Sequence, residues 1–350
     1  IADPASSVQP DSTIDMAARA RGTTLYIPEG ASRMLCESCL EDYALGLKEK
    51  AGLGDSCGLG FKIKVSENCQ IEECDIKKVR VKVKMITYQE AEEQKETSEL
   101  KPLFELARRN LIRRNENNAV TIQMPEVRIK VDKETKIVTV TPEEKFESND
   151  MIQEMMLLAG EGAARFAFKN QIPFPYVSQE APQFPEKIPD GWAGQFAKVK
   201  CMRKRSVGIT PSPHAGLGLS FYSQVTSPLR RYSDLVAHQQ LRAFIDGKKL
   251  LDKDEMLERI SAGDAASIAA KKASRLSDTH WKLVYLLQNP DLTFEGFCIE
   301  KKGSDSLFLI PSLDMQTTLK ACSEIELNQT VNLKACNIDV TTLNVDFIKL

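Results

Sequence analysis

Residues 226–235 read Thr-Ser-Pro-Leu-Arg-Arg-Tyr-Ser-Asp-Leu. Serine is a favoured N-cap residue and proline suits the first helical position, so Ser227 and Pro228 predict the start of a helix. Apolar residues recur along one side as far as Asp246, and Gly247 predicts the end. The same stretch places two adjacent arginines in the first turn of the predicted helix.

The two arginines, Arg230 and Arg231, stand at the helix end that disfavours cations, because the helix dipole makes the N-terminus positive. The placement is explained if an anion binds there, since free backbone N–H groups and guanidinium groups together form a phosphate site. In the alternative interpretation Arg230 pairs with Asp234 one turn later, which would contribute ~0.3–0.5 kcal/mol. The spacing alone leaves both interpretations open.

The arginine stretch resembles the signature T-S-P-I/L-R-R/K-Y-x-D of the RNase II-type (RNB-family) exoribonucleases. Four other segments agree with the family in the same order along the chain: residues 1–3 match I-A-D, residues 15–26 resemble D-x-x-A-x-x-R-G/A-x-S/T-x-Y, residues 85–88 are similar to L-T-Y, and residues 213–219 are similar to P-H-x-G-L-G-L/I. The arginine signature is highly specific, and the other segments are individually weak. The resemblance covers essentially the whole chain.

The resemblance implies an α/β (α+β) RNB-type catalytic core followed by a small all-β OB-type barrel of the S1 kind. The periodicity predicts a long helix over residues 253–287, and five short alternating stretches between residues 294 and 348 suit such a barrel. We therefore expect a partial RNB domain over residues 1–290, with its N-terminal part missing, and an S1-like RNA-binding domain over residues 291–350.

Within the core, the same periodicity predicts further elements. Helices are expected over residues 37–50, 99–114 and 149–169, and strands over residues 59–65 and 79–85.

The family degrades single-stranded RNA from the 3′ end, releases nucleoside 5′-monophosphates, and uses Mg²⁺ to activate water. The resemblance implies that Arg230 neutralises the scissile phosphate, that Tyr26 clamps the terminal nucleotide, and that Tyr88 helps to recognise the sugar. For each tyrosine, a half-buried strand residue is the alternative interpretation. Further RNA contacts are expected from Gln153, Thr226, Ser227 and Arg231.

The sequence departs from the family pattern at three places, which together comprise four residues. The motif I-E-E-x-M reads Ile-Gln-Glu-Met-Met at residues 152–156, so Gln153 replaces the glutamate that assists sugar recognition. An amide can still hydrogen-bond a 2′-OH, although it carries no charge. Ile122 stands where some members stack an aromatic residue on the bases, and Gln224-Val225 stands where His-Phe is common.

The metal ligands of the family form an acidic cluster, D-x-x-x-x-x-D-x-D-D, shortly before the I-A-D motif. We therefore expect the Mg²⁺ ligands upstream of Ile1, and Asp3 is the nearest carboxylate within the sequence. One carboxylate does not hold two metal ions. The 350 residues alone are expected to bind RNA weakly and cleave nothing. A catalytically inactive RNB-type RNA-binding protein is the alternative, and an acidic cluster upstream would discriminate against it.

The amino-acid composition limits the class of protein and its cellular compartment. No stretch reaches the ~18 consecutive apolar residues that span a bilayer. The nine scattered cysteines favour a reducing compartment, so we expect a cytoplasmic or organellar protein. The family resemblance implies single-stranded RNA as its partner, and we expect a monomer. The formal net charge of −2 is not typical of a nucleic-acid-binding protein, so RNA binding would require a local path of basic residues. The basic runs at residues 198–205 and 271–275 are either solvated faces or parts of such a path.

Cysteines and histidines offer a few weaker candidates. Cys36 and Cys39 could bind zinc together with Cys69 and Cys74, but free thiols suit these spacings better. His214 is expected to support the loop before the signature, and His238 to pack or cap within the signature helix.

Overall fold

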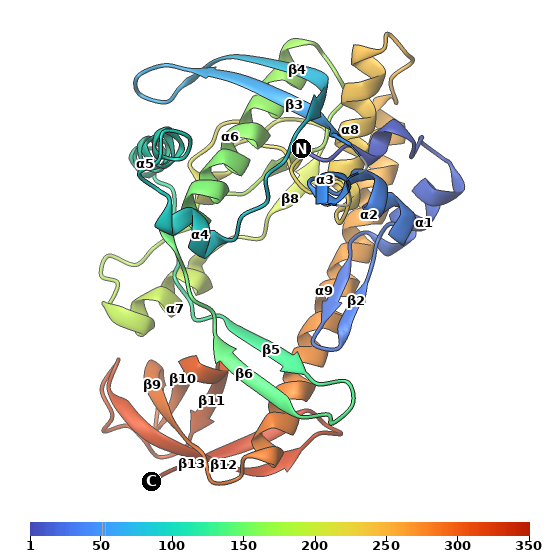
Figure 1. Cartoon of the computed structure of the whole chain (residues 1–350). Helices are drawn as coiled ribbons and strands as arrows, with labels where there is room; N and C mark the ends of the chain where they lie inside the picture. Colours follow the sequence, from blue (N-terminus) through green and yellow to red (C-terminus); the bar gives the residue numbers. More distant parts are fainter. Residues whose placement is uncertain (51, 53) are drawn as a thin grey trace.

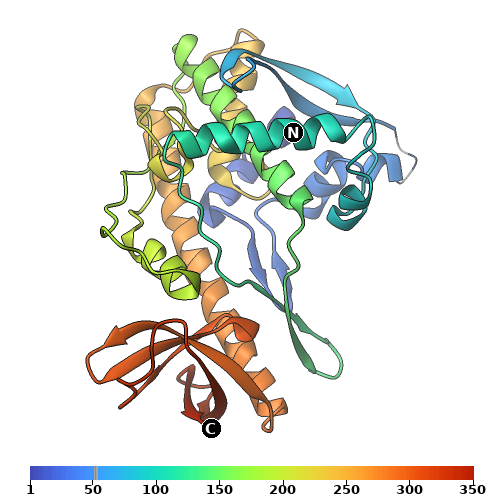
Figure 2. The same ribbon diagram turned by 90° about the vertical axis from the view of Figure 1, so that its left-hand side faces the viewer.

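The computed structural model describes residues 1–50, 52 and 54–350. An α/β core lies at one end of the molecule and an antiparallel, barrel-like sheet at the other, and helix α9 (Lys253–Gln288) runs between them (Figure 1). The hairpin of β5 (Val127–Val131) and β6 (Val138–Pro142) also reaches from the core to the barrel (Figure 2). The predicted fold class, a mixed core followed by an all-β barrel, is confirmed.

The strands of the core pair two by two in antiparallel fashion: β1 with β2, β3 with β4, and β7 with β8. The first elements are η1 (Pro4–Ser6), α1 (Thr13–Arg21), β1 (Leu25–Ile27), β2 (Gly30–Ser32), α2 (Glu37–Tyr43), α3 (Leu47–Lys50), β3 (Ser56–Val65), β4 (Ile71–Val81), α4 (Tyr88–Glu93) and α5 (Lys101–Glu116). After the β5–β6 hairpin come α6 (Glu147–Lys169), β7 (Tyr176–Ser178), α7 (Gly191–Cys201), β8 (Ser206–Gly208), η2 (Ala215–Leu217) and α8 (Tyr232–Ile245).

Helix α8 is the centre of the core. One side of it, with Tyr232 and Leu235, packs against η1, α1, α2 and α9. Another side, with Ala237 and Leu241, packs against α6 and the β3–β4 hairpin. A helix with buried residues on more than one side belongs to the interior of a domain. The signature at its start is therefore held by a fixed framework.

The start of α8 differs from the prediction. The helix begins at Tyr232 and not at Ser227, and Arg231 occupies the N-cap with an extended backbone. The cause is a tertiary contact: the N–H groups of Thr24 and Tyr232 donate to the carbonyls of Arg230 and Gly22, at 3.0 and 2.9 Å. This bridge holds the backbone extended where the local capping pattern favours a helix. The two arginines consequently precede the helix.

Three other predicted boundaries are wrong. The helix predicted over residues 37–50 is divided into α2 and α3, because Gly46 between them adopts φ +85°, which a helix does not allow. The strand predicted over residues 79–85 ends at Val81. Helix α6 begins at Glu147, two residues before the predicted start, and the Asn149 side chain accepts a hydrogen bond from the Phe146 N–H at 3.0 Å.

The barrel-like sheet has five antiparallel strands in the order β11-β10-β9-β12-β13. They are β9 (Thr293–Lys302), β10 (Asp305–Ile310), β11 (Met315–Leu319), β12 (Thr330–Asp339) and β13 (Asn344–Lys349), with η3 (Pro311–Leu313) between β10 and β11. Each of the five predicted stretches overlaps one of these strands. Leu283 and Leu286 of α9 are buried in the core of the sheet beside Phe308 and Leu333, so the end of α9 belongs structurally to the barrel.

Among the described residues, no helix is both long enough and apolar enough to cross a membrane.

We expect Leu283→Ala to destabilise the protein by about 2–5 kcal/mol, because it opens a cavity where α9 enters the barrel core. Leu287, one turn later on the same helix, is 50% exposed, and Leu287→Ala is the matched control with a change within about 0.5 kcal/mol. Denaturant unfolding of both variants measures the difference. Equal losses of stability would show that α9 does not contribute to the barrel core.

Candidate nucleic-acid site

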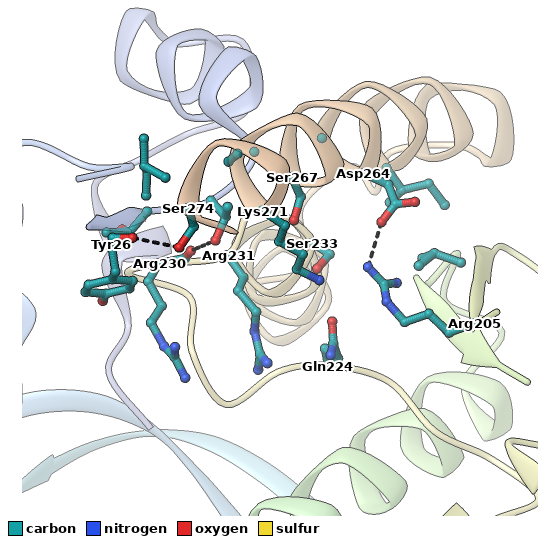
Figure 3. Close-up of a pocket in the computed structure, with 18 residues that line it drawn as sticks. Tyr26, Arg205, Gln224, Arg230, Arg231, Ser233, Asp264, Ser267, Lys271 and Ser274 are labelled. Carbon is teal, nitrogen blue, oxygen red and sulfur yellow. Dashed lines mark hydrogen bonds and ion pairs between the residues drawn. The ribbon is translucent and has the colours of Figure 1, made fainter. Parts of the chain in front are cut away.

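The arginine segment, residues 226–231, lies beside a pocket of about 310 Å³. The pocket is bounded by Gly22–Tyr26, by the arginine segment and by one side of α9, and a volume of this order suits a small ligand group. The side chains of Arg230 and Arg231 extend side by side into the open space, and Lys271 reaches toward it from α9 (Figure 3). We call this the arginine pocket.

Four cationic side chains line the arginine pocket, and they differ in their partners. Arg205 pairs with Asp264 at 2.7 Å, and Arg231 pairs with the buried Asp234 at 2.7 Å. Arg230 and Lys271 form no ion pair with any of the described residues. The predicted alternative that Arg230 pairs with Asp234 is therefore wrong, because Arg231 and the Ser227 N–H (2.8 Å) occupy that carboxylate.

Electrostatics inside the pocket favour an anion. Desolvation lowers the pKa of Lys271, although much of its side chain is exposed, and the neighbouring Arg205 and Arg231 lower it further. Asp264 opposes this effect only in part. A bound anion such as phosphate would balance the positive charges of Arg205, Arg231 and Lys271.

A buried polar network anchors the start of α8 below the pocket. Asp15 is fully buried and accepts hydrogen bonds from the Tyr232 hydroxyl at 3.2 Å and from the Gln239 amide at 2.9 Å. Burial and the Asp15 charge raise the pKa of Tyr232 to about 12, so its hydroxyl remains a donor at neutral pH. Arg19 in turn donates to the Tyr232 oxygen at 3.1 Å. Side chains of α1 thus hold the start of α8 in place.

The other residues predicted for RNA binding lie in different places. Tyr26 is half-exposed on the wall of the arginine pocket, and its carbonyl accepts a hydrogen bond from Ser274 at 2.8 Å. The Thr226 hydroxyl accepts a hydrogen bond from Arg231 at 3.2 Å, so Thr226 orients this arginine. Tyr88 begins α4 and is also half-exposed, but it is not among the residues that line the arginine pocket.

A second pocket of about 800 Å³, which we call the Gln153 pocket, contains two further predicted positions, Gln153 and Ile122. It shares Arg205 and Gln224 with the arginine pocket, so the two hollows adjoin at these side chains. Residues from α6, from the loop after α5 and from the loop containing His214 line it. The two pockets therefore adjoin on the same side of the core.

Two histidines and Asp3 have structural roles. His214 bridges Leu219 through backbone hydrogen bonds and stacks edge-on against Tyr222, which agrees with its predicted support of the loop. Burial lowers the pKa of His214 to about 4, so its ring is neutral at pH 7. His238 is buried and donates to the Val225 carbonyl at 2.7 Å. Asp3 is buried and forms an ion pair with Arg242.

The residues that the structure describes do not fit a metal centre. Within residues 1–50, 52 and 54–350, no three His, Cys, Asp or Glu side chains converge closely enough to hold a metal ion. Asp3 is already neutralised by Arg242, so it does not suit the magnesium role considered for it. The zinc alternative fails as well, because Cys69 and Cys74 lie in the β3–β4 hairpin and do not complete a site with Cys36 and Cys39.

Arg205 and Lys271 are the site residues that the sequence did not single out individually. Both belong to predicted basic runs, but a run does not indicate which of its members faces a pocket. Lys200 of the same run as Arg205, for example, forms an ion pair with Glu300 of the barrel.

Comparison with known proteins agrees with this geometry. The family model described as RNB domain matches residues 1–190 and 192–247. An uncharacterized ribonuclease of Synechocystis sp. is 32% identical over 97% of this chain and 52% of its own length. A ribonuclease II of Arabidopsis thaliana, named chloroplastic/mitochondrial, is 31% identical over 82% of this chain and 37% of its own length.

The same fold occurs in a solved structure. RNase R of Mycoplasma genitalium, in complex with ribose-methylated single-stranded RNA, superposes with a TM-score of 0.83 at 16% identity. The alignment covers 100% of this chain and 66% of the RNase R chain. The chain spans about half the length of the Synechocystis relative and a smaller share of the Arabidopsis relative. Because the family model matches well over half of its residues and the arginine segment lies within the match, this chain belongs to the RNB family of ribonucleases.

Proposed function

We propose that this chain is the RNA-binding and phosphate-neutralising part of a 3′→5′ exoribonuclease that degrades single-stranded RNA to nucleoside 5′-monophosphates. The observation that carries the proposal is Arg230: its guanidinium has no ion-pair partner among the described residues and points into a cation-lined pocket (Figure 3). The ribonuclease names of the relatives support the RNA-degrading class.

The proposed roles follow from position. Arg230 neutralises the negative charge that develops on the scissile phosphate, while Arg231 is held by Asp234 and Thr226 and contributes a fixed positive charge. Tyr26 stacks on the terminal base at the pocket wall. Gln153 hydrogen-bonds a ribose 2′-OH in the adjoining Gln153 pocket.

Metal binding, cellular location and oligomeric state of the protein are proposed as well. Since the described residues do not fit a magnesium site, we assign Mg²⁺ binding to residues outside this chain and no step of the reaction to a metal here. We propose that the protein is a monomer with RNA as its partner, in the cytoplasm or, like the relative named chloroplastic/mitochondrial, in an organelle. The barrel, together with the end of α9, is proposed to be the S1-like RNA-binding module.

The experiment that tests this function uses the full-length gene product, single-stranded RNA and DNA of the same sequence, and Mg²⁺ with or without EDTA. We expect release of nucleoside 5′-monophosphates from RNA only, and loss of this release in EDTA. Binding of RNA without any Mg²⁺-dependent release would overturn the enzyme and favour the inactive RNA-binding alternative.

Tyr26→Ala is expected to weaken binding of single-stranded RNA by about 1–3 kcal/mol, because one base loses its stacking partner. Tyr26→Phe keeps the aromatic ring and should bind nearly as well as the wild type. Since Tyr26 is 51% exposed, thermal melting should change little in either variant. Fluorescence anisotropy with labelled RNA measures the effect, and equal affinity of the alanine variant and the wild type would exclude stacking on Tyr26.

Lys271→Ala is expected to reduce the salt dependence of RNA binding. Removal of one phosphate contact should make the slope of log K against log salt shallower by about 0.7 for a single strand. Lys272 is adjacent and exposed but does not line the arginine pocket, so Lys272→Ala is the matched control. Binding titrations at several salt concentrations give the slopes. Identical slopes for the two variants would mean that Lys271 contacts no phosphate.

A further inference from the structure

Cys36 and Cys39 form a pair of thiols at the start of α2 that the proposed function does not use. Their Sγ atoms lie 3.3 Å apart. Cys36 is the exposed N-cap residue of the helix, whereas Cys39 is buried in the cluster that contains Tyr232 and Leu235. One thiol of the pair is thus open to solvent reagents, and the other faces it from the interior.

The two thiols also differ in reactivity. A hydrogen bond with the Ser38 hydroxyl at 3.2 Å, together with bonds involving Cys39, lowers the pKa of Cys36. Burial raises the pKa of Cys39 to about 12. The thiolate is the form that attacks a disulfide, so Cys36 is the attacking sulfur and Cys39 the one that acts second.

We propose that Cys36 and Cys39 form a reversible intramolecular disulfide by exchange with a small-molecule disulfide such as oxidised glutathione. The bond requires the two sulfur atoms to approach by about 1.3 Å, from 3.3 Å to the ~2.05 Å of a disulfide. The exposed side of Cys36 admits the reagent, and the short distance allows Cys39 to react before a second reagent molecule does.

The exchange is balanced in two steps. The Cys36 thiolate attacks one sulfur of the small disulfide, whose S–S bond breaks, and a small thiolate leaves with the electron pair and takes up a proton. Cys39 then gives its proton to solvent and attacks Cys36 Sγ, which expels the second small thiolate. The two cysteines are oxidised, and one small disulfide is reduced to two thiols.

The disulfide would form next to the arginine segment. The Met34 N–H, two residues before Cys36, donates to the Thr24 hydroxyl at 3.1 Å. The Thr24 N–H donates in turn to the Arg230 carbonyl at 3.0 Å. Thr24 therefore links Met34, two residues before Cys36, to Arg230, the residue that the proposed function places on the scissile phosphate.

The test exploits the tryptic peptide of residues 34–48, which contains Cys36 and Cys39 and no other cysteine. The folded protein is incubated with oxidised and reduced glutathione in fixed ratios, quenched with acid, alkylated and digested. We expect this peptide to lose the mass of two hydrogen atoms and to escape alkylation, and dithiothreitol to reverse both changes. RNA is not needed, so the result is independent of the proposed nuclease activity.

Three variants make the assignment specific. Cys39→Ser should retain a stable glutathione adduct on Cys36, because the second thiol is absent, and Cys36→Ser, at an exposed position, should show neither adduct nor disulfide in this peptide. Cys201→Ser changes a half-buried cysteine of α7 and should leave the oxidation unchanged. A peptide that stays reduced in the folded wild type, carries a lasting glutathione adduct there, or oxidises only after unfolding in urea would overturn the proposal.

Discussion

Replacing Arg230 by alanine in the full-length gene product is expected to slow RNA cleavage by roughly 10²–10³-fold, the scale for removal of one group that stabilises charge in a transition state. Stability should hardly change, because Arg230 is exposed and makes no ion pair with the described residues. RNA affinity should fall much less than turnover, since other contacts to the backbone remain.

Two further variants separate the chemical role of Arg230 from a structural one. Arg230→Lys should restore little activity, because an ammonium group does not reproduce the planar guanidinium fork. Arg231→Ala should behave differently and lose stability, because it removes the partner of the buried Asp234. Single-turnover cleavage and thermal melting distinguish the three. Cleavage at nearly the wild-type rate by Arg230→Ala would remove Arg230 from the reaction.

The second large effect is expected at Glu154, where Glu154→Ala should destabilise the protein by about 3–5 kcal/mol. Glu154 is buried and accepts hydrogen bonds from Arg114 Nε at 2.9 Å and from Asn110 at 2.8 Å, both on α5. Its loss leaves the buried Arg114 charge unpaired. Because Arg114 also donates to the Leu217 carbonyl at 3.0 Å, the loop beside the Gln153 pocket should loosen as well.

The neighbouring residue supplies the control for this prediction. Gln153 precedes Glu154 on α6 but is exposed, so Gln153→Ala should alter stability by no more than about 0.5 kcal/mol. The double variant Arg114→Met/Glu154→Leu should recover most of the loss, because no unpaired charge remains buried. Denaturant unfolding measures all three. A loss for Glu154→Ala as small as that for Gln153→Ala would show that the ion pair does not stabilise the core.

Most of the secondary structure was predictable because its signals are local. Helix α9 and all five barrel strands follow from hydrophobic periodicity within each segment. The start of α8 was not predictable in this way. Its capping pattern at Ser227 and Pro228 is strong, but the bridge to Gly22–Thr24, some two hundred residues away in sequence, holds the backbone extended.

Some residues of the site are indicated by local sequence motifs, whereas others depend on tertiary contacts. The motif resemblance indicated Arg230, Arg231 and Tyr26, and the structure brings these three together at one pocket. The partner of Asp234 depends on where the helix begins, so spacing alone did not decide whether Arg230 pairs with this carboxylate. Lys271 enters the site only because α9 crosses the arginine segment, which no local pattern reveals.

We propose above all that the full-length protein removes nucleotides one at a time from the 3′ end of single-stranded RNA. The most direct measurement follows two RNAs of the same sequence, one labelled at the 3′ end and the other at the 5′ end, with the full-length protein in excess over RNA and Mg²⁺ present. We expect the 3′ label to appear in mononucleotides from the first turnover, while the 5′-labelled RNA shortens stepwise. Release of the 5′ label first, or internal fragments without mononucleotides, would contradict it.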